Sequence, residues 1–379
     1  MINEATQASL AELRKGVLDA HHTRYGSAAD VIVGFQLTHS GRFCRPQDSR
    51  RPEPWIAFHH PLLDRRFPAS CPLHLVPDAE IPTLVAHYVH AARVAWNAGA
   101  DFVDIKHCHG YLLHEFLAAH TRPGRYGGSF DNRTRILREI VAGIRADGNP
   151  IDIAVRLSAF DLVPFRPDPD RSQPGHPGPG IPEDYSACLP YCYAFGTPFE
   201  NPLEPDLTEA LQFMDLCSRL GVKLLNVTGG SPYYNPHIQR PAAYPPSDAY
   251  RPPEDPLVGV ARQVQAVRQL KAKAPPGLVL IGSAYSYLQE FLPRVAQAVL
   301  RQGWVDLVGV GRAVLSYPEM LADAVSKGAL LKSRICRTFS DCTTAPRHGL
   351  VSGCYPLDPH YSGRPEAQRL KELKRGGTA

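Results

Sequence analysis

The chain has 379 residues, of which 44% are hydrophobic and 21% charged, with a formal net charge of +4. This is the composition of a globular protein, and so weak a positive charge gives no reason to expect a nucleic-acid partner. No apolar run is long enough to span a bilayer. The polar N-terminal segment lacks a hydrophobic signal, so we expect a cytoplasmic protein whose nine cysteines are reduced rather than paired.

Short apolar segments alternate with amphipathic ones along most of the chain. The apolar segments are rich in β-branched residues, as strands buried on both faces must be. These candidate strands are 31–37, 102–106, 151–157, 223–228, 278–282 and 306–310. Apolar residues at three- and four-residue spacing predict helices over 8–20, 79–98, 132–145, 207–219, 256–272, 287–302 and 318–327. The alternation predicts a parallel sheet covered by helices.

Two kinds of parallel sheet fit this order, an open doubly wound sheet and a closed (β/α)8 barrel. No GxGxxG motif follows the first strand, which argues against a dinucleotide-binding fold. The two longest loops, 41–77 and 159–206, follow strand C-terminal ends, where barrels carry their active sites. We therefore predict an α/β fold of the (β/α)8 TIM-barrel class, with six strands recognisable in the sequence. The Pro- and Gly-rich part of the second loop is either a lid over the site or a solvated insertion.

The densest group of reactive side chains follows the second candidate strand. Lys106, His107, Cys108, His109 and Tyr111 stand within six residues of one another. A cation, two imidazoles and a phenol at one strand end can bind an anion and move a proton. Each of these residues alone would most often be structural, but their number within one turn indicates a site.

This segment, VDIKHCHGYLLHEF followed by RYGGSFDNR, resembles the signature of the Old Yellow Enzyme family of NADH:flavin oxidoreductases. Further blocks occur in the family's order, namely FQLTHSGR at 35–42, IAVRLS at 153–158, VTGG at 227–230, IGS at 281–283 and GVGRA at 309–313. The resemblance covers residues 8–330 approximately. It implies an FMN-dependent oxidoreductase of the ene-reductase type, in which hydride passes from NAD(P)H through FMN to an activated alkene.

The resemblance also implies roles for residues near the strand ends. Tyr111 would supply a proton to the alkene, and His109 with Lys106 would bind the carbonyl or nitro oxygen of the substrate. Gln36 and Arg156 would hydrogen-bond the pyrimidine edge of the flavin, where a guanidinium stabilises the charge that arrives on reduction. Backbone N–H groups at two loop-to-helix junctions would hold the FMN phosphate, with glycine allowing close approach. The residues of this phosphate site are Gly282, Ser283, Gly311 and Arg312.

The sequence departs from the family pattern at two places in the barrel. The family's first two strands have no counterpart, so we expect an N-terminally incomplete barrel, with strands 3 to 8 in an FMN-binding domain of residues 1–330. Lys106 stands where the family usually has His. This favours an anionic or strongly polarised substrate, or a lysine turned toward the flavin.

A Cys-containing extension of residues 331–379 resembles a broken iron–sulfur motif. The 2,4-dienoyl-CoA reductase-like branch, to which the chain is most similar, carries C-x2-C-x3-C-x11-C after the barrel. Cys342 and Cys354 keep the last spacing, but Cys336 is displaced and a fourth cysteine is missing. Because such clusters take four thiolates, we expect no intact [4Fe-4S] cluster.

Two other interpretations are compatible with the sequence. His107 and His109 form an H-x-H pair that could bind zinc in a metal-dependent TIM-barrel hydrolase, since alternate residues of a strand face the same way. A non-catalytic, truncated barrel would keep the motifs without binding flavin. The main interpretation assigns no metal ligand, and its partner is a small-molecule substrate, with neither nucleic acid nor a membrane. Whether the chain forms a homo-oligomer is left open.

Overall fold

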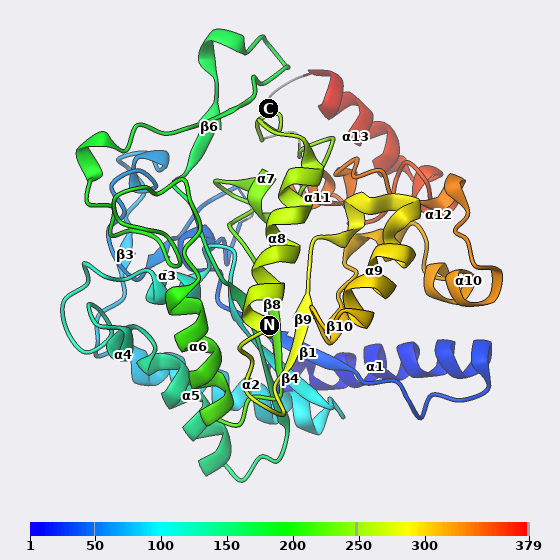
Figure 1. Cartoon of the computed structure of the whole chain (residues 1–379), viewed down its shortest axis with the longest axis horizontal. Helices are drawn as coiled ribbons and strands as arrows, with labels where there is room; N and C mark the ends of the chain where they lie inside the picture. Colours follow the sequence, from blue (N-terminus) through cyan, green and yellow to red (C-terminus); the bar gives the residue numbers. More distant parts are fainter. Residues whose placement is uncertain (49, 247–248, 377–379) are drawn as a thin grey trace.

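A six-stranded parallel sheet forms the centre of the molecule (Figure 1). The computed structural model describes residues 1–48, 50–246 and 249–376. The strands of the sheet lie in the order β1-β4-β5-β8-β9-β10. Their bounds are Gly34–Leu37, Phe102–His107, Asp152–Ser158, Leu224–Thr228, Val279–Gly282 and Leu307–Val308. Each of the six overlaps a segment that the sequence predicts as a strand, which confirms those predictions.

The strand order identifies the class of the sheet. Each central strand pairs in parallel with the next central strand along the chain, and the order never reverses. A doubly wound sheet has a point at which the order reverses, whereas a (β/α)8 barrel does not. Within the described residues, β1 and β10 are not paired with each other. The predicted TIM-barrel class, with six strands, is confirmed.

Helices connect consecutive strands and lie around the outside of the sheet, and further helices follow the last strand (Figure 1). Their bounds are α1 Glu4–Tyr25, α2 Ile81–Asn97, α3 Leu112–Leu117, α4 Phe130–Arg133, α5 Arg135–Ala146, α6 Thr208–Arg219, α7 Pro236–Gln239, α8 Pro256–Lys271, α9 Leu292–Arg301, α10 Met320–Lys327, α11 Asp341–Arg347, α12 Pro359–Ser362 and α13 Pro365–Gly376. Every helix predicted from the sequence has a counterpart, although the α-helix predicted over 287–302 begins only at Leu292, after a 3₁₀ segment (Tyr285–Phe291). In the described part of the chain, no helix is both long and apolar enough to cross a membrane.

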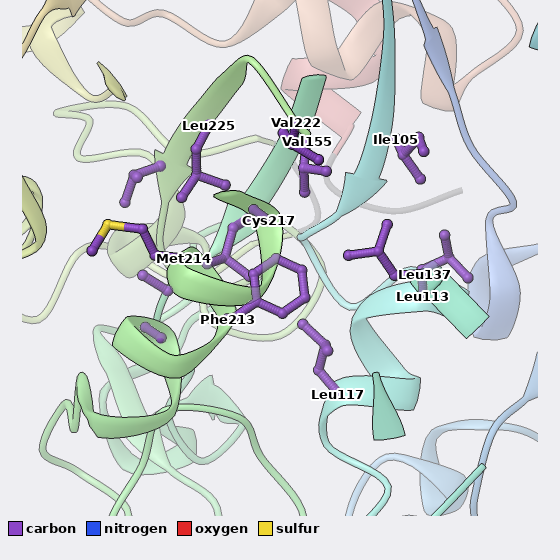
Figure 2. Packing of buried hydrophobic residues seen from close by; sticks show 14 of the residues in the cluster. Ile105, Leu113, Leu117, Leu137, Val155, Phe213, Met214, Cys217, Val222 and Leu225 are labelled. Atoms are coloured by element: carbon purple, nitrogen blue, oxygen red, sulfur yellow. The ribbon is translucent and has the colours of Figure 1, made fainter. Parts of the chain in front are cut away.

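The outer face of the sheet is apolar and packs against these helices. Val155 of β5 and Leu225 of β8 lie beside Phe213, Met214 and Cys217 of α6 (Figure 2). All five side chains are fully buried. Burial of this apolar surface stabilises the sheet against its helices and leaves the inner face of the sheet for polar residues.

The loop of residues 41–77 is anchored by two buried arginines. Arg42 donates from Nε to Glu115 Oε1 of α3 at 2.5 Å, and it also pairs with Asp64 inside the loop. Arg122 donates from Nη1 to the backbone oxygen of Ala57 at 2.7 Å. Two short strands of the loop, β2 (Trp55–Ile56) and β3 (His74–Leu75), pair with each other. The loop is therefore held in one position although it contains little regular structure.

The loop of residues 159–206 is held by a buried carboxylate. Asp161 accepts hydrogen bonds from the Tyr234 hydroxyl at 2.6 Å and from Asn235 Nδ2 at 2.7 Å. Its Pro- and Gly-rich part forms the antiparallel pair β6 (Phe165–Pro167) and β7 (Gly180–Pro182), outside the central sheet. This stretch therefore adds no strand to the central sheet.

We predict that Arg42→Met destabilises the protein by about 3–5 kcal/mol, because it leaves the buried Glu115 carboxylate without its cation. Urea unfolding followed by circular dichroism measures the loss. Arg51→Met, an exposed change in the same loop, is the control and should alter stability by less than about 0.5 kcal/mol. Adding Glu115→Leu to Arg42→Met should restore part of the loss. Equal stability of Arg42→Met and the control would contradict the prediction.

Candidate active site

A cavity of about 920 Å³ lies at the C-terminal ends of the central strands. The strand ends, and the residues that directly follow them, contribute His109, Arg156, Asn226, Thr228, Ser283, Ala284, Ser286 and Gly309–Arg312. Loops and the C-terminal extension contribute Arg42, Phe43, Arg45, Pro52, Phe67, Pro232, Tyr233, Gln239–Pro241, Thr343 and Pro346–His348. None of these described lining residues comes from 159–206, so that loop does not cover the cavity in this conformation.

The ends of β9 and β10 form a cationic part of the cavity wall. The backbone N–H of Gly309 donates to the Gly282 oxygen at 2.8 Å, which holds the two strand ends together. Ser283, Gly311 and Arg312 line the cavity beside this junction. A Cβ on Gly311 would meet no protein atom within 4 Å, so this residue faces open space. The predicted phosphate-site residues are therefore gathered at one place, with Gly282 directly behind the wall.

Two arginines meet at this part of the wall. Arg312 hydrogen-bonds Thr343, and Arg240 donates to Ser340 Oγ at 2.9 Å. Burial and the neighbouring charge of Arg240 lower the pKa of Arg312 to about 10. Both guanidinium groups stay charged at neutral pH, so this end of the cavity suits an anionic group such as a phosphate.

The inner face of the sheet carries polar atoms that lack a partner. Arg156 Nε and Thr228 Oγ1 are buried without a hydrogen bond, and both residues line the cavity. Gln36 does not line the cavity; its Nε2 donates to Asp104 Oδ2 at 2.6 Å, and Asp104 Oδ1 has no partner. Buried polar atoms are rarely left without a hydrogen bond. A ligand with a polar edge would supply the missing partners along this row of residues.

His109 enters the cavity because the chain changes conformation after β4. His109 and Gly110 both have left-handed backbones, with φ of 68° and 72°. A Cβ on Gly110 would lie 2.7 Å from the Tyr234 ring, so only glycine fits there. The His109 N–H donates to Ser158 Oγ at 3.1 Å, and Ser231 Oγ donates to the His109 oxygen at 2.9 Å. Burial holds the pKa of His109 well below its usual range, so the imidazole is neutral.

Lys106 and Tyr111 pack against each other behind the cavity wall. The ammonium of Lys106 lies 3.5 Å from the centroid of the Tyr111 ring, a cation–π contact. Burial lowers the pKa of Lys106 to about 8. Burial and the nearby Tyr233 raise the pKa of Tyr111, whose hydroxyl oxygen lies 2.8 Å from that of Tyr233. Tyr233 lines the cavity and stacks on Phe43, with ring centroids 3.8 Å apart. The Tyr111 hydroxyl, which lies behind the wall, is therefore linked to the cavity by the Tyr233 hydroxyl.

His107 and His109 lie on opposite sides of the sheet. His107 is fully buried on the outer face, with its ring 5.5 Å from that of Phe213 in α6. The left-handed backbone at His109 ends the strand alternation on which the H-x-H zinc hypothesis depends, so that hypothesis is wrong. Among the described residues, no group of three or more His, Cys, Asp or Glu side chains is arranged to hold a metal ion.

The C-terminal cysteines gather beside the arginine-rich end of the cavity. Burial raises the pKa of the Cys354 thiol to about 11, and Cys336 and Cys342 are close enough to add to that shift. The same two thiols interact electrostatically with Arg240. Residues of the extension form part of the cavity wall. That residues 331–379 form a unit separate from residues 1–330 stays a prediction.

Several lining residues were not found from the sequence. Tyr233 and Arg240 follow the strand end VTGG, and their position after a barrel strand was the signal that could have identified them. Arg45 lies in an irregular loop and Arg347 in the extension, where no local pattern marks them. Only the folded chain brings these residues to one cavity.

Part of the sequence is similar to a known family. Residues 25–168 match the model of the NADH:flavin oxidoreductase / NADH oxidase family. A 12-oxophytodienoate reductase-like protein of Arabidopsis thaliana is 32% identical over 155 residues, which are 39% of this chain and 45% of the relative. The chain thus spans less than half the length of that curated relative.

Two solved structures share the fold at lower identity. A complex of 2-naphthoyl-CoA reductase with 2-naphthoyl-CoA matches with a TM-score of 0.59 and 19% identity, over 96% of this chain and 46% of the other. The old yellow enzyme homologue from Zymomonas mobilis matches with a TM-score of 0.53 and 20% identity, over 87% of this chain and 74% of the other. At these identities the likeness shows the fold alone.

We predict that Lys106→Met raises thermal stability at neutral pH. The pKa of Lys106 in the folded protein, about 8, lies below its ordinary value of 10.5. Below pH 8 the folded protein therefore keeps a charged ammonium buried, and the whole free-energy cost of that burial opposes folding. Between pH 8 and 10.5 the native lysine is neutral while the unfolded one still binds a proton, so the stability of the wild type rises with pH and the penalty disappears near pH 10.5. The difference in Tm should therefore be largest below pH 8 and should narrow toward pH 10.5. A difference that is constant with pH would contradict the prediction.

Proposed function

We propose that the chain is an NAD(P)H-dependent, FMN-binding oxidoreductase of the ene-reductase type, acting on an activated alkene. The observation that carries this proposal is the arrangement of the cavity. One end has the arginines and glycines suited to a phosphate, the inner sheet face has unpaired polar atoms, and His109 lies near a tyrosine pair. The family match supports a flavin and a nicotinamide donor.

The residues present fit FMN. Arg312, Ser283 and the backbone around Gly311 would hold the phosphate, because the wall there is cationic and open. Arg156, with its unpaired Nε, would hydrogen-bond the pyrimidine edge of the flavin. Gln36 would join it only by giving up its hydrogen bond to Asp104. When bound, FMN would take hydride from NAD(P)H and deliver it to one carbon of the alkene.

The side chains around the substrate would bind it and supply the proton. His109 is neutral, so it would donate one N–H to the substrate's activating oxygen without adding a charge. Tyr111 keeps its phenolic proton because its pKa is raised, as an acid must. Tyr233 stands between Tyr111 and the cavity, so the second alkene carbon would receive the proton from Tyr233, and Tyr111 would replace it. Lys106, packed on the Tyr111 ring, would position that ring rather than bind the substrate.

Flavin binding is the first test of the proposal. Purified protein mixed with FMN should quench flavin fluorescence at a stoichiometry of one. Arg312→Gln should weaken the affinity about 10- to 150-fold, the equivalent of one charge-assisted hydrogen bond of about 1.5–3 kcal/mol. Arg301→Gln, an exposed change in α9, is the control and should bind FMN as the wild type does. Absence of flavin binding would contradict the proposal and would favour a non-catalytic barrel.

Loss of either hydroxyl of the tyrosine pair should slow proton delivery. In flavin-loaded protein, Tyr111→Phe and Tyr233→Phe should each slow reoxidation by an alkene by about 10²–10⁴-fold. Reduction by NAD(P)H, which needs no proton from this pair, should be nearly unchanged. Stopped-flow absorbance separates the two half-reactions, and the exposed Tyr25→Phe is the control. Reoxidation at the wild-type rate in Tyr111→Phe would remove it from the mechanism.

A further inference from the structure

Asp104 is a partly buried carboxylate to which the proposed reaction gives no role. It lies in the middle of β4, and Gln36 of β1 is its partner in the strand register. Gln36 Nε2 donates to Asp104 Oδ2 at 2.6 Å, while Asp104 Oδ1 is buried without a hydrogen-bond partner. Neither side chain lines the cavity. Asp104 therefore belongs to a layer of side chains one step below the residues that form the cavity wall.

The layer above Asp104 contains two cations. Lys106 and Arg156 are partners in the register of β4 and β5, and Arg156 lines the cavity. Asp104 stands two residues before Lys106, so both side chains leave the strand on the same face. Standard strand spacings put the Cα atoms of Asp104 and Arg156 roughly 8 Å apart on the diagonal, which a long side chain spans. The Asp104 carboxylate interacts electrostatically with both cations.

Arg156 has an unused hydrogen-bond donor for this carboxylate. Its Nε is buried without a partner, as Asp104 Oδ1 is, so an unpaired donor and an unpaired acceptor lie on neighbouring strands. Burial raises the pKa of Asp104, whereas the hydrogen bond from Gln36 and the two nearby cations favour the ionised carboxylate. Burial also raises the pKa of the Cys108 thiol to about 11, so that neighbour is neutral. Asp104 is thus the counter-charge to the two cations.

We propose that Asp104 is a positioning residue that offsets the charge of Arg156 and thereby keeps the reduction potential of the flavin low. The inference rests on the proposed function, in which Arg156 hydrogen-bonds the pyrimidine edge of FMN. A guanidinium at that edge stabilises the negative charge that arrives on reduction, which raises the reduction potential. A carboxylate one layer behind the guanidinium opposes this effect through space. A lower potential makes the reduced flavin a stronger hydride donor to the alkene.

The test uses Asp104→Asn, which removes the charge but keeps an oxygen that can accept from Gln36. The reduction potential of bound FMN, measured by equilibration with a redox dye, should rise. We expect the ratio of reduced to oxidised flavin at a given potential to increase about tenfold, which is about 30 mV for a two-electron couple. Asp104→Glu, which keeps the charge, should shift this ratio less. Asp152→Asn removes an exposed carboxylate at the other end of β5 and should leave the potential at the wild-type value.

A purely structural role of Asp104 would give a different result, because structural damage weakens the oxidised and the reduced flavin alike. We expect instead that Asp104→Asn binds oxidised FMN nearly as the wild type does and reduced FMN about tenfold more tightly. The potential and the two affinities form one thermodynamic cycle, so the two measurements check each other. Equal weakening of both forms, or an unchanged potential, would overturn the inference. Asp104→Ser serves if a thermal melt shows that Asp104→Asn is not folded.

Flavin-free protein separates this inference from the function on which it rests. If the protein takes up no FMN, the proposed function fails, but the pairing of Asp104 with Arg156 can still be measured. Urea unfolding of Asp104→Asn, Arg156→Gln and the double variant should show losses of stability that are not additive, because each single change leaves one charge without its counter-charge. Additive losses would contradict the charge pair. If FMN binds and the potential of Asp104→Asn equals that of the wild type, the inference is wrong while the flavin function stands.

Discussion

The buried ion pair between Arg42 and Glu115 is the contact on which the cavity depends. A guanidinium with no exposed surface must be paired, and here it is paired with a carboxylate of α3 and with Asp64 in its own loop. Glu115 also accepts the backbone N–H of Ala57 at 3.0 Å through its other oxygen. This network ties an irregular loop to the helix that follows β4. Phe43 therefore stands where it can stack on Tyr233.

The division between core and site is made by the backbone at the end of β4. Strand alternation directs His107 outward, where its ring packs against Phe213. Two consecutive left-handed residues then direct His109 into the cavity. A bulkier residue at Gly110 would collide with Tyr234, so the glycine is required by packing and by conformation. Within three residues, the chain thus passes from His107, which packs in the core, to His109, which lines the cavity.

Burial determines the protonation states that the proposed chemistry needs. It keeps His109 neutral, holds the proton on Tyr111 and brings the pKa of Lys106 to about 8. The same desolvation that is unfavourable for folding would therefore prepare a hydrogen-bond donor and an acid for the proposed reaction. The arginines keep their charge under equal burial, because a guanidinium begins from a much higher pKa. The cavity is consequently cationic while its imidazole and phenols are uncharged.

The sequence by itself determined the strands, the helices and the face of the sheet that carries the site. Apolar periodicity reflects burial directly, and the buried positions of α5 are Ile136, Leu137, Ile140, Val141 and Ile144, as the spacing predicts. His109 and Arg156, which the motifs after the strands pointed to, line one cavity with Ser283, Gly311 and Arg312, and their roles there stay predictions. These features are local, since each depends on residues that are neighbours in the chain.

Only the tertiary structure decided which side chains meet. The Lys106 ammonium lies over the Tyr111 ring, and Tyr233 lies between that ring and the cavity. Arg347, which also lines the cavity, belongs to the C-terminal extension. Beyond a strand end, the direction of a side chain depends on backbone angles that follow no period. The strand alternation that would put His107 and His109 on one face therefore ends before His109. The loop of residues 41–77 is placed by ion pairs between residues 73 positions apart. Contacts at such separations leave no pattern in a single sequence, because their energy is gained only when the whole chain has folded.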